Sequence, residues 1–114
     1  MRIGVIGAGA VGGTLAALLD RAGHTVEVTA RGPHLDAIRA DGIRMNGGWG
    51  EHVARVHAGE VLRRDPEFVI LATKAQDARV ALEANAKPVS SVPLLVAITA
   101  PPLSAPPTYE GRET

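Results

Sequence analysis

Three glycines near the start of the chain have the spacing with which a protein backbone can hold a dinucleotide. The residues are Gly7, Ala8, Gly9, Ala10, Val11 and Gly12, which fit the pattern G-x-G-x-x-G. In such a turn the first glycine permits a tight bend, the second lets a pyrophosphate approach the backbone, and the third lets a helix pack closely on a sheet. A chain with thirteen glycines meets this pattern by chance fairly often. The flanking elements must therefore decide whether the turn holds a ligand.

The elements predicted around residues 7–12 are those that nucleotide binding needs. A short apolar run at 3–6 predicts a strand buried on both faces of a parallel sheet. From Ala10 the apolar residues recur at helical spacing, and Gly23 supplies a stop. With a second strand at 25–30, where apolar and polar residues alternate, these elements form a right-handed βαβ unit. Because the turn opens a helix whose free amides attract phosphate, dinucleotide binding is favoured over a glycine turn without a ligand.

The residue after the second predicted strand discriminates between NAD and NADP. An NAD site places Asp or Glu about 20 residues after the turn, where the carboxylate binds the ribose 2′-hydroxyl. Counting from Gly12 leads to Arg31, with no carboxylate beside it. A guanidinium can bind a 2′-phosphate through two parallel hydrogen bonds. We therefore expect NADP, held by Arg31 with charge added by His34 or Arg39; the alternative is that Arg31 is a solvated loop residue.

Weaker patterns continue the alternation of helices and strands. They predict a short helix at 33–40, a hairpin of 43–46 and 52–56 around Gly-Gly-Trp-Gly, a buried strand at 67–73, an alanine-rich helix at 75–86 and a last strand at 92–98. Together the elements predict an α/β fold of Rossmann type, with a doubly wound and mostly parallel sheet over residues 1–100. Residues 101–114 form a proline-rich tail, which we expect to be disordered.

Composition excludes several other kinds of function. Twelve basic residues balance twelve acidic ones, so we expect no bulk attraction to nucleic acid or to a membrane surface. There is no cysteine, which excludes disulfides and a thiol nucleophile. No stretch approaches the roughly 18 apolar residues of a membrane helix, and no targeting segment is visible, so we expect a cytoplasmic protein.

The histidines do not form a recognisable metal site. They are His24, His34, His52 and His57, and no pair of carboxylates completes a ligand set with them. His52 and His57 are five residues apart on the predicted hairpin, where their side chains would point to opposite faces. We expect surface or loop histidines and no metal.

The glycine turn, the segment TARGPHLDAIRADGIRM and the segment FVILATKAQD together resemble the ketopantoate reductase family. Its members are NADP-dependent 2-dehydropantoate 2-reductases within the wider 6-phosphogluconate-dehydrogenase-like group. The resemblance runs from residue 1 to about residue 98, and its most specific pieces are Arg31-Gly32 and Lys74-Ala75. It implies that Lys74 contacts the cofactor and lines the catalytic cleft, next to Thr73 in the cofactor site. Lys74 also follows a predicted buried strand, beyond whose carboxyl end ligands bind in open α/β sheets; the alternative is a lysine that begins an exposed helix.

The chain also departs from that family. The family has an asparagine after its fifth strand, where this chain reads Ile98-Thr99-Ala100-Pro101-Pro102. A second, helical domain of the family supplies the catalytic lysine and the groups that hold the keto acid, and the sequence contains no counterpart, as if the gene or the reading frame had been interrupted. We therefore expect an NADP(H)-binding domain that is catalytically incomplete alone.

Two alternatives stay open. The first is one half of an oxidoreductase, completed in trans by another chain or by a dimer mate that helps to hold a 2-keto acid. The second is a non-enzymatic nucleotide-binding or interaction module. An unpaired sheet edge would favour a homo-oligomer.

Overall fold

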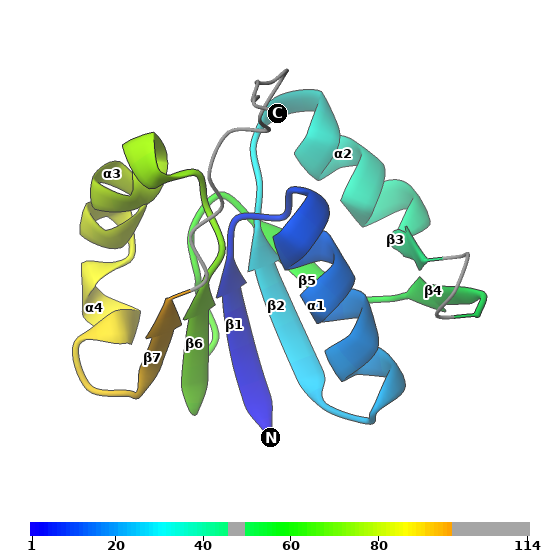
Figure 1. Cartoon of the computed structure of the whole chain (residues 1–114), viewed down its shortest axis with the longest axis horizontal. Helices are drawn as coiled ribbons and strands as arrows, with labels where there is room; N and C mark the ends of the chain where they lie inside the picture. Colours follow the sequence, from blue (N-terminus) through cyan, green and yellow to red (C-terminus); the bar gives the residue numbers. More distant parts are fainter. Residues whose placement is uncertain (46–49, 97–114) are drawn as a thin grey trace, which may run out of the picture.

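A parallel sheet with the strand order β5-β2-β1-β6-β7 forms the centre of the structure, a computed structural model that describes residues 1–45 and 50–96 (Figure 1). The elements are β1 (Arg2–Ile6), α1 (Ala10–Arg21), β2 (Thr25–Thr29), α2 (Gly32–Asp41), β3 (Ile43–Met45), β4 (His52–Ala54), β5 (His57–Gly59), β6 (Phe68–Leu71), the 3-10 turn η2 (Ala75–Asp77), α3 (Ala78–Ala84), α4 (Ala86–Val89) and β7 (Leu94–Val96). All pairs in this sheet are parallel.

Alternate residues of the sheet face two different layers of helices. Ile3 and Val5 of β1 belong to a core cluster that includes residues of α1 and α2. Ile6 of the same strand packs in a second cluster with residues of β6, α3 and α4. Because side chains alternate along a strand, the two clusters lie on opposite faces of the sheet. The prediction of a doubly wound, mostly parallel α/β sheet is confirmed.

β2 is buried on both faces, although alternating apolar and polar residues are typical of a half-buried strand. The carboxylate of Glu27 accepts hydrogen bonds from the backbone N–H groups of Arg63, at 2.9 Å, and Arg64, at 3.0 Å. The hydroxyl of Thr29 accepts one from the backbone N–H of Gly7, at 3.0 Å. A buried polar side chain is tolerated where such partners exist. Glu27 thereby fixes the segment between β5 and β6.

Residues 57–59 form a strand that the sequence patterns did not predict. The expected hairpin is present as the antiparallel pair β3–β4, but β4 ends at Ala54, and His57 begins β5, which pairs in parallel with β2. His52 and His57 therefore lie in different sheets, so the prediction that both histidines lie on the hairpin is wrong. Trp49 lies outside the described residues.

The predicted helix at 75–86 is divided into η2, α3 and α4. The division between the last two falls at Asn85, which is 2% exposed. Its Oδ1 accepts a hydrogen bond from the backbone N–H of Leu62, at 2.7 Å, and its Nδ2 donates to the carbonyl of Ala81, at 2.8 Å. Asn85 thus joins the second helical layer to the same segment that Glu27 holds.

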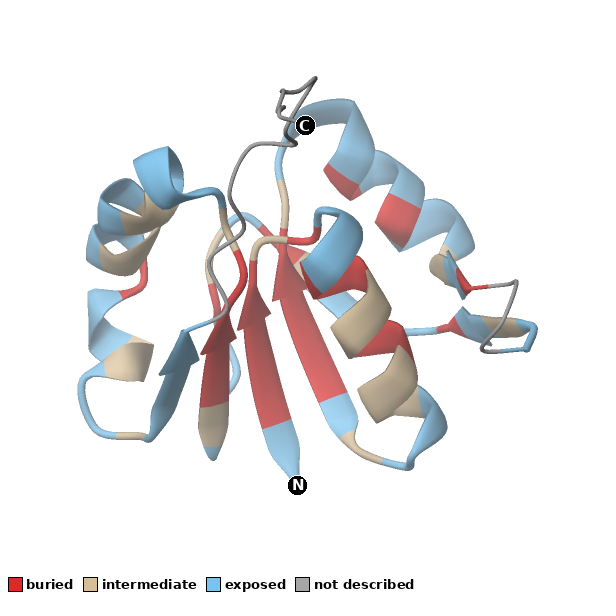
Figure 2. Cartoon of the chain, viewed as in Figure 1, coloured by how far each residue is buried: buried red, intermediate tan, exposed pale blue. Residues whose placement is uncertain are grey.

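Burial is concentrated in the three central strands (Figure 2). Most of β1, β2 and β6 is buried, whereas all three residues of β7 are exposed. β6 is shorter than predicted, and of the last predicted strand, 92–98, the structure describes only the part that contains β7. Within residues 1–45 and 50–96, none of the helices is long and apolar enough to span a membrane. The predicted tail, 101–114, lies outside the described residues.

Candidate nucleotide-binding site

The first glycine of the turn after β1 has a backbone that favours glycine. Gly7 has a φ of +98°, in the left-handed region. A Cβ added there would lie 2.9 Å from Cγ2 of Thr73 and 3.0 Å from the carbonyl oxygen of Ala72. Both neighbours follow β6, so the turn sits against the end of the adjacent strand. Any larger residue would push these two strand ends apart.

The other two glycines of the pattern differ in the space around them. A Cβ on Gly12 would collide with the carbonyl oxygen of Gly7, so the start of α1 can approach the turn only without a side chain. Among the described residues, a Cβ on Gly9 would meet nothing within 4 Å. Gly9 therefore borders open space, as the second glycine of a dinucleotide turn should.

The N-terminus of α1 opens into this space. No side chain of residues 1–45 or 50–96 forms a capping hydrogen bond at the helix start, and the first turn of the helix carries no acidic residue. Gly9, Ala10 and Val11 are all exposed. The first backbone amides of a helix lack partners within the helix and carry a partial positive charge. The turn thus offers donors and space to an anionic group.

The remaining predicted residues lie at the carboxyl ends of the strands on either side of β1. Arg31 follows β2, precedes the first turn of α2 and is exposed. Thr73 and Lys74 follow β6, with Lys74 exposed. Among the described residues, Oγ1 of Thr73 is buried and has no hydrogen-bond partner. From β1 the chain first adds β2 and β5 on one side of the sheet and then β6 and β7 on the other. Open α/β sheets bind their ligands at the carboxyl ends of the strands, at the point where the strand order reverses in this way.

His34 and Arg39, the two residues expected to add charge near Arg31, have hydrogen-bond partners of their own. Nε2 of His34 lies 2.7 Å from the carbonyl oxygen of Ala8, inside the glycine turn. Nε of Arg39 donates to the carbonyl of Ala58 in β5, at 3.2 Å. The contact of His34 with the turn was not foreseen from the sequence, and its position three residues after Arg31 gives no local signal of it.

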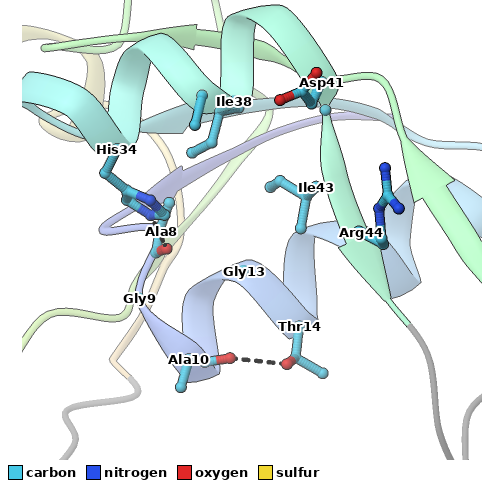
Figure 3. Close-up of a pocket in the computed structure, with 12 residues that line it drawn as sticks. Ala8, Gly9, Ala10, Gly13, Thr14, His34, Ile38, Asp41, Ile43 and Arg44 are labelled. Carbon is cyan, nitrogen blue, oxygen red and sulfur yellow. Dashed lines mark hydrogen bonds between the residues drawn. The ribbon is translucent and has the colours of Figure 1, made fainter.

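An open pocket of about 520 Å³ lies beside the turn, between α1 and α2 (Figure 3). It is lined by Ala8, Gly9, Ala10, Gly13, Thr14, His34, Ala37, Ile38, Asp41, Gly42, Ile43 and Arg44. The ring of His34 and the carbonyl of Ala8 stand at one end, and Arg44 at the other. The pocket shares Ala8, Gly9 and Ala10 with the glycine turn and so extends the open space there.

Within the described residues no group of three or more histidine and acidic side chains could hold a metal ion. His52 instead forms a pair with Asp20 of α1, with 2.9 Å between Nε2 and Oδ2. That contact fastens the β3–β4 hairpin to the end of α1. The donors at the carboxyl edge, by contrast, are backbone amides, a hydroxyl and cationic side chains, a set that fits a phosphorylated ligand.

The chain is similar to proteins of one family. Residues 3–99 match the family described as ketopantoate reductase PanE/ApbA. A 2-dehydropantoate 2-reductase of Mesorhizobium japonicum is 42% identical over 86 residues, which make up 73% of this chain and 26% of that protein. A candidate ketopantoate reductase of Ralstonia solanacearum MolK2 superposes with a TM-score of 0.79 at 32% identity, over 90% of this chain and 33% of that one.

A second solved structure agrees. The 2-dehydropantoate 2-reductase of Methylococcus capsulatus superposes with a TM-score of 0.68 at 28% identity, over 84% of this chain and 33% of that one. The chain thus spans about a quarter of the length of the curated relative and about a third of each solved chain.

Proposed function

Because the chain belongs to the ketopantoate reductase family, we propose that it binds NADP(H) at the carboxyl edge of its sheet and forms the cofactor half of a 2-dehydropantoate reductase site. One observation carries the proposal. The glycine turn opens at Gly9 into the uncapped start of α1, and Arg31 stands at the end of β2 where an NAD site has a carboxylate.

The proposed roles follow from what each group can do. The backbone amides at the start of α1 bind the pyrophosphate, because the residues there are exposed and the first amides of a helix lack partners within it. Arg31 binds the 2′-phosphate, since its exposed guanidinium can make two parallel hydrogen bonds to one phosphate. Thr73 takes the place in the cofactor site that the family resemblance implies; its unpaired hydroxyl is buried in this structure, so a ribose or nicotinamide group would reach it only after the side chain rotates. Lys74 takes the cleft-lining role that the family resemblance implies.

Bound NADPH would supply a hydride, and the protein would have to orient a keto acid against it. Reduction of a carbonyl also needs a donor aimed at the oxygen on which negative charge develops. At the carboxyl edge the described residues supply groups suited to the nucleotide. We therefore propose that groups beyond residues 1–96, in the same protein or in another chain, hold the keto acid, and that this chain alone binds NADPH without turning over 2-dehydropantoate.

The test is a calorimetric titration of the purified chain with NADPH and, separately, with NADH. We expect clear preference for NADPH in the wild type. Arg31→Asp should lower NADPH affinity about 30-fold, corresponding to about 2 kcal/mol for a lost charge-assisted contact, and leave NADH affinity nearly unchanged. Arg63→Asp makes the same change of charge in the segment between β5 and β6 and serves as the control.

Each result has a clear reading. If the wild type binds neither nucleotide, the proposed function is wrong. If the Arg31 variant keeps its preference for NADPH, the assignment of the 2′-phosphate to Arg31 is wrong. Addition of 2-dehydropantoate to the NADPH complex should leave NADPH unoxidised; steady oxidation would instead favour a complete enzyme. Binding without turnover, even with every candidate partner chain added, would favour a non-enzymatic nucleotide-binding module.

A further inference from the structure

The contact between His34 and Ala8 joins two parts of the candidate site that are 26 residues apart in sequence (Figure 3). His34 lies in the first turn of α2, three residues after Arg31. Ala8 is buried inside the glycine turn. A carbonyl oxygen can only accept a hydrogen bond, so Nε2 of His34 carries the proton whether the ring is neutral or charged. The donor and the acceptor are 2.7 Å apart.

The hydrogen bond from His34 fixes the orientation of the whole peptide unit between Ala8 and Gly9, not only that of the Ala8 carbonyl. The peptide unit between Ala8 and Gly9 is planar and trans, so its C=O and N–H groups point in opposite directions. Holding the Ala8 oxygen toward α2 therefore directs the Gly9 N–H away from α2. Gly9 is exposed and its neighbourhood is open. The peptide is thereby kept in one orientation before any ligand arrives, which reduces the cost of ordering it on binding.

We propose that His34 is a positioning residue for the pyrophosphate, acting through the Ala8–Gly9 peptide and not through contact with the nucleotide. The inference rests on the proposed function and adds to it a coupling between the 2′-phosphate site and the pyrophosphate site. The segment that carries Arg31, for the 2′-phosphate, also braces the turn, for the pyrophosphate. This role differs from the one expected from the sequence, in which His34 adds charge next to the 2′-phosphate.

Two variants and three ligands separate these roles. The variants are His34→Ala, which removes the donor, and His34→Gln, whose side-chain amide can donate from a similar position. The ligands are NADPH, NADH and adenosine 2′-phosphate, which carries the group for Arg31 but has no pyrophosphate. His57→Ala, at an exposed histidine of β5, is the control. Thermal unfolding of each variant reports whether the fold is intact.

We expect His34→Ala to weaken NADPH and NADH by the same factor, about three- to tenfold, the size of one net hydrogen bond. Adenosine 2′-phosphate should bind as tightly as to the wild type, and His34→Gln should restore most of the lost affinity. A merely structural histidine would weaken all three ligands and lower the melting temperature, which would overturn the proposal.

Three further outcomes also overturn it. A loss confined to NADPH and adenosine 2′-phosphate would place His34 on the 2′-phosphate. Unchanged affinities in His34→Ala, with a wild type that binds NADPH, would remove the positioning role and leave the proposed function intact. A wild type that binds neither nucleotide would overturn both together.

Discussion

The two halves of the sheet differ in how completely they are covered. In the half formed by β1 and β2, α1 lies so close that four of its residues are buried, and these are Gly12, Gly13, Ala16 and Ala17. In the half formed by β6 and β7, α3 has no buried residue and β7 is exposed along its length. The pair of valines Val28 and Val96 measures the difference, since they are 0% and 50% exposed.

The difference indicates which half of the sheet holds its groups in fixed positions without help from other parts of the protein. Small residues let α1 approach β1 closely, and that approach brings the helix amides to the turn at Gly9. Hydrogen bonds then brace the turn at successive residues. The N–H of Gly7 donates to the hydroxyl of Thr29, His34 donates to the carbonyl of Ala8, and the carbonyl of Gly9 accepts from the N–H of Gly13 in the first helical turn. In the other half, Thr73 and Lys74 follow β6, and the neighbouring strand β7 is exposed along its length. We propose that the first half holds the phosphates of the nucleotide, and that the second half, with Thr73 and Lys74, depends on further parts of the protein to complete its site.

The largest effect is expected from a side chain that prevents α1 from packing closely against the glycine turn. In Gly12→Ala the new Cβ meets the carbonyl of Gly7, so we expect a loss of about 3 kcal/mol of stability and no NADPH binding. Gly13→Ala, one residue later on the same helix, makes only ordinary contacts and should unfold like the wild type. Chemical denaturation and NADPH titration check both. Wild-type stability in Gly12→Ala would show that the backbone of the turn can move to accommodate a Cβ, and would contradict this requirement for glycine.

Next in size is the direct comparison of the two halves by one substitution. Val28→Ala removes two methyl groups from a fully buried site and should cost about 2 to 3 kcal/mol. Val96→Ala removes the same groups from exposed β7 and should cost less than about 1 kcal/mol. The measurement is urea denaturation of both variants. Equal losses would mean that β7 is covered in solution, by another copy or by residues outside those described.

The smallest effect is expected at the far end of the sheet. The backbone N–H of Arg2 donates to Oε1 of Glu67, at 2.8 Å, and this hydrogen bond, with the charge of Arg2, lowers the pKa of Glu67 below its ordinary value of 4.5. A lowered pKa in the folded state gives stability that is present above 4.5 and is lost as the pH falls through the lowered value.

Glu67→Gln should therefore melt slightly below the wild type at neutral pH, and the two melting curves should converge on acidification. Because Glu67 lies at the amino ends of the strands, NADPH affinity should not change. A gap between the two proteins that grows as the pH falls would contradict this sign.

Much of the first half was predictable because its signals are local. The apolar run before Gly7, the helical period after Ala10 and the stop at Gly23 fixed β1 and α1 to within a residue or two. The glycine pattern also predicts local geometry, because Gly7 is required by its left-handed φ and Gly12 by the tight space around it. That Arg31, Thr73 and Lys74 bind a nucleotide stays a prediction.

The features that were missed are made by contacts distant in sequence. β5 contains Ala58 and Gly59, whose residue types have low strand propensity, and it is a strand because β2 pairs with it. The helix break at Asn85 depends on a bond to Leu62, 23 residues away. No local pattern contains such a partner, so propensity extended the helix through residue 86.

The strand order has a consequence for how the chain assembles during synthesis. β1 is made first but ends at the centre of the sheet, with β2 on one side and β6 on the other. The bond between Arg2 and Glu67 spans 65 residues, so one edge of β1 stays open until the chain has been made through Leu71. Of the strand pairs in the described part of the chain, only the small β3–β4 hairpin joins residues that are close in sequence. Such long-range pairing slows folding and leaves a nascent apolar strand exposed to wrong partners.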